Sequence, residues 1–201
     1  GKGAKVIQIR AVEFANKFKV PVRVLSSFTK GNGTLIYLKE DNNMENALVS
    51  GIAFQKDQVK ITLHGVIDTP GIAYQILGPL SDENIEVDVI VQNVSVNGKT
   101  DFTFTVSKED ELAATNIIKA NNNALQYDDV LVDSNIAKVS LVGVGMRTHA
   151  GIASEAFKAL AENNVNIQMI STSEIKITIV INEVNTDKAV KCLHEAFNLD
   201  K

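Results

Sequence analysis

The sequence predicts an α+β fold made of two copies of one βαββαβ unit, and three observations lead to that prediction. Residues 65–94 align without a gap on residues 145–174, at a constant offset of 80. Around each copy, period-two strand patterns alternate with helical patterns. A further strand-like segment, residues 48–54 (LVSGIAF), has no place inside either copy. Self-similarity at a fixed offset indicates repeated supersecondary units, so two small related domains are expected.

The first copy opens with a strand and a turn. Residues 59–64 alternate apolar and polar side chains, as a strand with one buried face does. The turn Asp68-Thr69-Pro70-Gly71 combines a helix-capping acid, a proline with preset φ and a conformationally free glycine. This turn predicts the start of a helix, with apolar residues at helical spacing as far as Leu80. Gly78 and Pro79 are expected to bend or interrupt that helix, because proline lacks an N–H donor.

The remaining elements complete the βαββαβ order, which is the ferredoxin-like arrangement. In the first copy we expect an almost fully buried strand through residues 85–91, a strand at Asp101–Val106, a helix at Glu109–Ala120 with an apolar side formed by Leu112, Ile117 and Ile118, and a strand at Leu125–Val132. In the second copy we expect a strand at Val139–Val144, a helix at Gly151–Glu162, strands at Val165–Ser171 and Lys176–Asn182, and a helix at Thr186–Phe197. The second copy therefore lacks a fourth strand.

Residues 48–54 offer that missing strand. If they pair there, they cover a sheet edge that would otherwise stay open, and the first copy is inserted into the second. The predicted organisation is then an N-terminal segment at residues 1–47, a first domain at residues 59–135, and a discontinuous second domain at residues 48–58 plus 136–201. In the alternative interpretation, residues 48–54 only extend a linker.

Composition and charge bound the class of protein. The 201 residues, 45% of them hydrophobic, suffice for two modest cores. No apolar run approaches the ~20 residues that span a bilayer, and the N-terminus lacks a signal-peptide layout, so we expect a cytoplasmic protein without a membrane segment. The net charge of −4 and the 5% aromatic content argue against nucleic-acid binding. The single cysteine, Cys192, is expected to pack in a core.

The sequence offers no catalytic or metal-binding constellation. His64, His149 and His194 fall on a strand, in a turn and on a helix, without the spacing of metal ligands or of a nucleophile with its base. The glycines at 143 and 145 lack the third glycine and the helix of a dinucleotide fingerprint, and no phosphate-binding loop occurs. We therefore expect no catalytic residue, metal or cofactor in this chain, and structural rather than functional roles for His64 and His194.

The two copies do offer two equivalent turns, residues 68–73 and residues 146–153. Each places backbone amides at a helix N-terminus, where carboxylates bind. Beside each turn the second strand of the copy ends in a polar run, Gln92-Asn93 or Thr172-Ser173-Glu174. Donors and acceptors within a few ångströms suit a zwitterion such as a free amino acid. The alternative is that Asp68 and Thr148 are helix caps and that Gln92 and Ser173 merely end strands.

The sequence as a whole resembles the regulatory part of bacterial aspartate kinase, which is built from paired ACT domains. The stretches that carry this resemblance are FANKFKVPVRVLSSF (residues 14–28), GTLI (33–36), VSGIAF (49–54), DTPG (68–71), IVQNVS (90–95), TDFTFTV (100–106), KVSLVGVGM (138–146) and NIQMISTSEIKI (166–177). The resemblance covers essentially the whole chain. Its most specific parts are VPVRVLSSF and the VQN and ISTSEIKI strand ends.

The resemblance implies a non-catalytic module that senses lysine, threonine or both and signals to a kinase region. Residues 1–47 would join that region, and the chain begins near its last helix, at residues 3–18. ATP and Mg would belong to the kinase region and not to this chain. The chain would be either a fragment or the separately made small subunit that some of these enzymes have.

The resemblance also implies an effector site formed by the first turn and by strand ends of both domains, often across two chains. Its residues would be Asp68, Pro70, Gly71, Ile72, Ala73, Gln92, Asn166 and Ile167. Asp68 would take the effector ammonium group, and Gln92 would bind other polar groups. The amides of Ile72, Ala73 and Ile167 would join Gln92 in that role. Ser95 and Thr103 would support the site from behind.

A second, pseudo-equivalent site would use Met146, His149, Gly151, Ile152, Ala153, Thr172, Ser173 and Glu174. Here Thr148 stands where the first copy has Asp68, and Gln168 stands where it has Asp88, so the case for cation binding is weaker. The expected assembly is a homodimer joined through edge strands of the ACT domains. Two other classes stay open: an enzyme in its own right, for which no acid–base pair is found, and a dimerisation module that binds no amino acid.

Overall fold

The computed structural model describes residues 7–36, 49–94, 97–143 and 150–199. The chain divides into two compact units, residues 1–47 and residues 48–201. The first unit holds helix α1 (Ile9–Lys17) and a small antiparallel sheet of β1 (Val22–Val24) and β2 (Thr34–Ile36). Phe14 on α1 is 65% exposed, Phe18 just after the helix is 59% exposed, and their ring centroids lie 5.1 Å apart. The end of α1 therefore presents an aromatic pair at the surface of its own unit.

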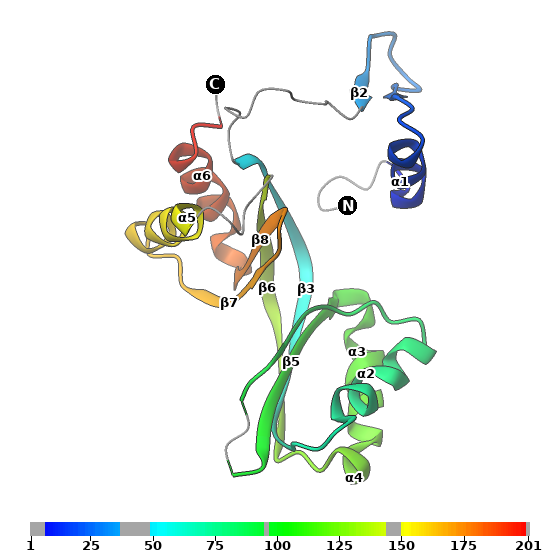
Figure 1. Cartoon of the computed structure of the whole chain (residues 1–201), viewed down its shortest axis with the longest axis vertical. Coiled ribbons are helices and arrows are strands. Elements are labelled where there is room, and N and C mark those ends of the chain that lie inside the picture. The colour runs from blue at the N-terminus through cyan, green and yellow to red at the C-terminus, as the bar shows by residue number, and fades with distance from the viewer. Residues whose placement is uncertain (1–6, 37–48, 95–96, 144–149, 200–201) are drawn as a thin grey trace. The chain divides into compact units, whose positions relative to one another are not determined.

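The second unit is built on a six-stranded sheet with the order β4-β5-β3-β6-β8-β7, in which all pairs are antiparallel (Figure 1). The strands are β3 (Val49–Ile67), β4 (Asp88–Gln92), β5 (Lys99–Ser107), β6 (Asp129–Gly143), β7 (Ile167–Thr172) and β8 (Lys176–Asn182). The helices are α2 (Ile72–Asp82), α3 (Glu111–Ala120), α4 (Asn122–Leu125), α5 (Ala150–Glu162) and α6 (Thr186–Ala196), with short 3-10 turns at Lys108–Asp110 and Glu183–Asn185. Two ACT-type βαββαβ units share this sheet.

Two long strands, β3 and β6, run through both βαββαβ domains of this sheet. Residues 49–55 of β3 pair with the end of β6, from Val49↔Gly143 to Gln55↔Lys138, whereas residues 58–67 pair with β5. The segment at residues 48–54 therefore lies in the sheet, as an N-terminal extension of the strand predicted at residues 59–64. Irregular register at Gln55 and Gln58 marks the passage from one unit to the other. The ranges of the two domains and the insertion of the first into the second stay predictions.

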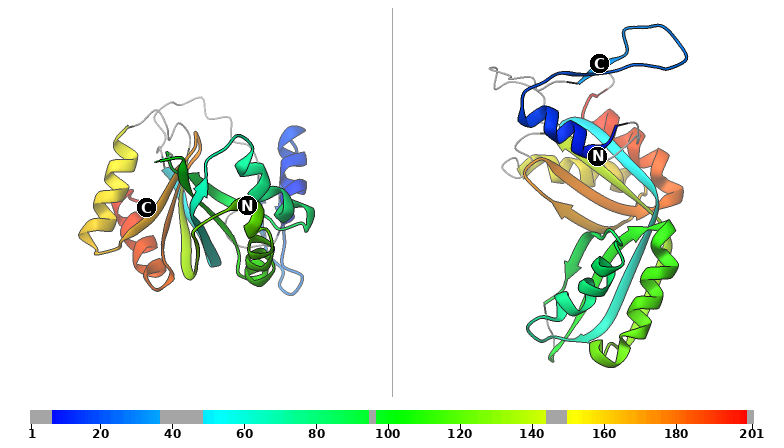
Figure 2. Two further views of the ribbon diagram at one scale, coloured as in Figure 1. Left: turned by 90° about the horizontal axis from the view of Figure 1, so that it is seen from below. Right: turned by 90° about the vertical axis from the view of Figure 1, so that its right-hand side faces the viewer.

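Each of the two βαββαβ domains has its own apolar core between its helices and its strands. In the first, Ile61, Leu63 and Phe104 pack against α2 and α3 and are fully buried. In the second, Leu141, Ile179 and Leu193 pack between the strands and helices α5 and α6. Figure 2 shows α5 and α6 on one side of the strands and α2, α3 and α4 on the other. Where the two domains adjoin, Lys138 of β6 lies against Asp88 of β4, and Val89 of β4 packs with Ile136 and Val180.

Three local predictions are wrong. Leu125 does not begin a strand: it ends α4, where it is 1% exposed, and β6 starts at Asp129. Leu112 is 73% exposed and lies outside the apolar side of α3. The strand through residues 85–91 is not almost fully buried, because β4 is an edge strand on which Ile90 is 51% exposed.

Helix α2 runs through Pro79, so the predicted interruption does not occur, whereas a bend at Gly78 and Pro79 stays a prediction. Proline leaves the carbonyl of Gln75 without its helical donor, and Gln75 is exposed, so water can satisfy that carbonyl. Ile76 and Leu80, on either side of the proline, are both fully buried. Core packing thus keeps the helix intact.

Among the described residues, no helix is long and apolar enough to cross a membrane.

Candidate functional site

The turn between β3 and α2 is the first candidate site. Gly71 occupies the N-cap position of α2 with φ 95° and ψ −4°, and no side chain caps this helix. A positive φ of this kind favours glycine. The Asp68 carboxylate is exposed and does not cap the helix, and its backbone N–H donates to the carbonyl of Gly98 at 2.9 Å. The turn is therefore held by its backbone, and its acidic side chain faces solvent.

Gln92 lies beside this turn, at the end of β4. It pairs with Phe102 of β5, and its side-chain Nε2 donates to Oδ1 of Asp68 at 3.4 Å. Both side chains are exposed. The structure thus brings together a carboxylate acceptor and an amide that both donates and accepts, which is the polar pair predicted for this corner.

The first-turn amides of α2 differ in their availability. The N–H of Ile72 donates to the carbonyl of Thr69 at 3.1 Å, and the Ile72 side chain is 5% exposed in the core. Ile72 therefore holds the turn in this structure. Pro70, which is exposed, has no N–H to offer. Ala73 follows in the first turn, where helix amides lack an intrahelical acceptor, and its side chain is partly buried.

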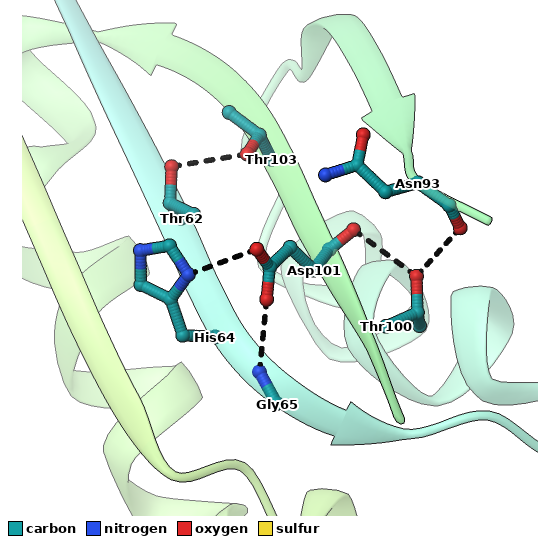
Figure 3. A network of polar contacts seen from close by, with 7 residues as sticks. All are labelled: Thr62, His64, Gly65, Asn93, Thr100, Asp101 and Thr103. Atoms are coloured by element: carbon teal, nitrogen blue, oxygen red, sulfur yellow. Dashed lines mark hydrogen bonds and ion pairs between the residues drawn. The ribbon is translucent and has the colours of Figure 1, made fainter. Parts of the chain in front are cut away.

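A polar network holds the strands behind this corner (Figure 3). Asp101 of β5 accepts a hydrogen bond from the Gly65 N–H at 3.0 Å through Oδ1, and its Oδ2 lies 3.1 Å from Nδ1 of His64. The Gly65 amide lowers the pKa of Asp101; partial burial opposes this shift, and the hydrogen bond and charge of His64 reinforce it. His64 therefore contacts Asp101 on the neighbouring strand, which is a structural role of the kind predicted for it.

The same network fixes the exit of β4. The Asn93 N–H donates to the carbonyl of Asp101 at 3.1 Å, and Oγ1 of Thr100 donates to the Asn93 carbonyl at 2.7 Å. Thr103 joins it to β3, because its hydroxyl lies 3.0 Å from that of Thr62. Support of the corner by Thr103 stays a prediction, and Ser95 lies outside the described residues.

Asp101 and Gly65 were missed by the sequence prediction. Gly65 carries a signal that could have identified it, because it is identical in the two copies. Its φ is +64°, and a Cβ there would lie 2.0 Å from Oδ2 of Asp128. Asp101 carries no comparable signal, because only the strand register places it beside His64.

Asn166 and Ile167 lie elsewhere in this chain. Ile167 begins β7 and pairs with Ile181, and the strand order places β7 and β4 at the two ends of the sheet. Within the described part of the chain, no hydrogen bond or ion pair joins Asn166 or Ile167 to Asp68 or Gln92. One chain therefore assembles the Asp68–Gln92 corner without the two residues expected from the other domain.

The second candidate site is described in part. Met146, Thr148 and His149 lie outside the described residues. Gly151, Ile152 and Ala153 form the start of α5; Ile152 is buried, Ala153 is partly buried and Gly151 is exposed.

The polar residues beside α5 form the β7–β8 hairpin. Its Ser173 accepts from the Lys176 N–H at 3.2 Å and donates its own N–H to the Lys176 carbonyl at 2.8 Å. Ser173 therefore closes the hairpin, while Thr172 and Glu174 are exposed. In the described residues no group of three or more His, Cys, Asp or Glu side chains could hold a metal ion.

Comparison with known proteins relates this chain to a group of regulatory proteins. The ACT domain family model matches residues 60–121 and 139–197. The chain is 57% identical over 198 residues to an aspartate kinase of Pseudomonas fluorescens, a match that covers 98% of this chain and 48% of the relative. The chain thus spans about half the length of the curated relatives it matches.

Two solved structures bear on the function. The regulatory subunit of aspartate kinase from Thermus thermophilus, in its ligand-free form, is similar with a TM-score of 0.71 and 33% identity, over 75% of this chain and 99% of that one. Aspartokinase III of E. coli in complex with lysine and aspartate is similar with a TM-score of 0.74 and 25% identity, over 96% of this chain and 42% of that one.

Proposed function

This chain belongs to the ACT-domain family of aspartate kinase regulatory regions, and from that premise we propose that it binds a free amino acid and thereby adjusts the activity of an aspartate kinase catalytic region. The effector in this proposal is lysine, threonine or both, acting as feedback inhibitors. The E. coli relative, with lysine and aspartate bound, supports the choice of lysine. ATP and Mg belong to the catalytic region in this proposal, and the site of action is the cytoplasm.

The observation that carries the proposal is the Asp68–Gln92 corner. Asp68 is exposed, is not used as a helix cap and lies within 3.4 Å of a side-chain amide. A carboxylate is the natural partner of an α-ammonium group, and helix N-terminal amides attract an α-carboxylate. The corner thus offers both halves of amino-acid recognition, with Gly71 allowing close approach because a Cβ there would meet nothing within 4 Å.

A second copy of the chain completes the site in this proposal. Within the described residues, no hydrogen bond or ion pair joins Asn166 or Ile167 to the Asp68–Gln92 corner, so in this proposal a partner chain supplies these two residues. The two edge strands carry exposed apolar residues at equivalent places, Ile90 at 51% and Ile170 at 42% exposure. Edge strands with such residues favour pairing with another chain, and a two-fold dimer would place β4 of one copy beside β7 of the other.

Regulation then follows from differential affinity. An effector that binds better to the domain arrangement of the inhibited enzyme shifts the population toward it, and only by that difference in affinity. A coupling of ~1 to 3 kcal/mol is ordinary for such systems. The residues of the second site, from Gly151 to Ala153 and from Thr172 to Glu174, are proposed as a weaker binding place, because no acid matches Asp68 there.

The first experiment is a thermal unfolding series of the purified chain with each of the twenty amino acids. A ligand at 100 times its dissociation constant stabilises the folded state by about 2.7 kcal/mol. We expect selective stabilisation by lysine or threonine, followed by calorimetric titration. Asp68→Asn should weaken binding by ~1 to 3 kcal/mol, the range for losing a charged hydrogen-bond partner. Asp82→Asn, an exposed change on α2, is the matched control.

The competing function is a dimerisation module that binds no amino acid. The exposed edge-strand residues Ile90 and Ile170 support this alternative as well. Absence of stabilisation by every amino acid, together with a dimer in sedimentation equilibrium, would favour it over the sensor. Equal titration curves for the wild type and Asp68→Asn would instead move the binding site away from this corner.

A further inference from the structure

Two lysines, one in each ACT domain, each contact an edge-strand residue of the other domain, and they occupy equivalent positions in the two sheets. Nζ of Lys138 on β6 lies 2.9 Å from Oδ2 of Asp88 on β4, and Nζ of Lys60 on β3 donates to Oε1 of Gln168 on β7. Lys60 pairs across the sheet with Thr105 of β5 as Lys138 does with Val180 of β8. Asp88 and Gln168 are related by the offset of 80. In each tie, a central strand of one domain holds the edge strand of the other.

The two ties differ in charge and burial. The Lys138 side chain is 3% exposed, and Asp88 is 44% exposed. A buried ammonium requires a charged or strongly polar partner. Lys60 is 21% exposed and has an uncharged amide as its partner across the domains, and it meets an acid of its own domain, Asp133, at 3.5 Å. Among the described residues, Asp88–Lys138 is thus the ion pair that joins an edge strand of one ACT domain to a central strand of the other.

An apolar contact accompanies the charged tie. Val89, next to Asp88, packs in one buried cluster with Ile136 and Val180 of the second domain, and Met169 of β7 packs against this cluster. Val89 has φ 43°, an unusual value for a β-branched residue, and the register of β4 shifts between Asp88 and Val91. The start of β4 is therefore a bulge fitted against the second domain.

The other end of β4 is the Asp68–Gln92 corner. Asp88 and Gln92 are four residues apart, or about 13 Å along an extended strand. The strand between them is anchored on β5, where Oγ1 of Thr105 donates to the Asp88 carbonyl at 2.7 Å. One short strand thus has the candidate effector corner at one end and the second ACT domain at the other.

We propose that the Asp88–Lys138 ion pair is the positioning contact through which occupancy of the Asp68–Gln92 corner reaches the second ACT domain. This inference rests on the proposed function, because it assigns a route to that site. An effector that engages Asp68 competes with its 3.4 Å contact to Gln92 and displaces the end of β4. Lys138 holds Asp88 at the other end of β4. The displacement therefore changes the packing between Val89 and Met169.

Methyl NMR of the intact chain provides the test. The chain has three methionines, and the Met169 signal is assigned by its loss in Met169→Leu. The wild type is titrated with the amino acid that stabilises it, and the Met169 methyl shift is recorded beside the affinity from calorimetry. The test variant is Asp88→Gln, which copies the neutral partner that Lys60 already has in Gln168. Glu86→Gln makes the same charge change at an exposed neighbour, and Asp88→Glu keeps the charge.

We expect effector binding to shift the Met169 methyl in the wild type, in Glu86→Gln and, in large part, in Asp88→Glu. In Asp88→Gln the effector should bind with nearly unchanged affinity while most of the Met169 shift is lost. If Asp88→Gln does not fold, Asp88→Asn with Lys138→Leu removes both charges and leaves none buried alone.

An equal Met169 shift in the wild type and in the charge-free variants would overturn the proposal, as would a silent Met169 in a wild type that binds the effector. If no amino acid binds the wild type in calorimetry, the proposed function itself fails and this inference falls with it. Calorimetry and NMR therefore separate the two failures.

Discussion

Replacing Gly65 with alanine should destabilise the chain by about 1 to 3 kcal/mol, the sum of two contributions that the structure supplies. The first is the left-handed backbone, φ +64°, which costs an L-residue roughly 1 to 2 kcal/mol. The second is a collision, because the new Cβ would lie 2.0 Å from Oδ2 and 3.2 Å from Cβ of Asp128. Asp128 must move and give up its exposed contact with Lys99, a loss of up to about 1 kcal/mol.

Gly71→Ala separates the two contributions. Its φ is +95°, but a Cβ there meets nothing within 4 Å, so only the backbone cost of ~1 to 2 kcal/mol should appear. Urea unfolding of the wild type and both variants measures the difference, provided that the slope with denaturant is unchanged. A Gly65→Ala variant no less stable than Gly71→Ala would refute the collision. A loss below about 0.5 kcal/mol would refute the strain argument as well.

Three further outcomes are expected. Gly78→Ala should raise the unfolding free energy by about 0.5 to 1 kcal/mol, because the new Cβ meets only the Tyr74 ring at 3.5 Å or more; a loss in urea unfolding would show that α2 cannot accept it. Asp101→Asn should cost ~0.5 to 1 kcal/mol at pH 7, discounted for partial exposure. The folded-state pKa of Asp101 is lowered, so its stabilisation is present above the ordinary value near 3.8 and is lost as pH falls through the folded value. Equal losses at pH 7 and pH 3 would contradict this. Burial raises the pKa of Cys192, so its reaction with a thiol reagent should be slow in buffer and fast in urea, and rapid labelling of the native chain would contradict its buried position.

Much of the local structure was predictable because the sequence pattern of the first copy recurs in the second. The strand predicted at Lys176–Asn182 coincides with β8, and the helix predicted at Gly151–Glu162 differs from α5 by one residue. Both have clear periodicity and end signals within a few residues. Edge strand β4 was harder, because exposure of its Ile90 depends on where the strand falls in the sheet, which periodicity does not encode.

At the Asp68–Gln92 corner, too, some contacts could be predicted from the sequence and others could not. Asp68 and Gln92 could be placed together because the turn after the first strand of the copy was expected beside the polar end of its second strand, and the 3.4 Å contact agrees with that reasoning. The pairing of His64 with Asp101 depends on the register between β3 and β5, and a shift of one residue would send either side chain to the other face. The role of Asp88 was also hidden, since its partner Lys138 lies 50 residues away.

The polar residues from 55 to 58 explain why the long strand β3 looks in the sequence like two short strands. Gln55-Lys56-Asp57-Gln58 interrupts the apolar alternation and resembles a linker. In the fold these residues lie where β3 leaves one ACT domain for the other, and Asp57 has φ 57°. The sheet faces that meet here bury Lys138, Thr105 and Ser140, polar residues that would be exposed in a single βαββαβ unit. Burial of polar groups is costly unless each is paired, so the two domains are matched to each other in a way that neither periodicity nor hydrophobicity displays. In the coupling proposed above, this match is the reason why a displacement of one domain would disturb its neighbour.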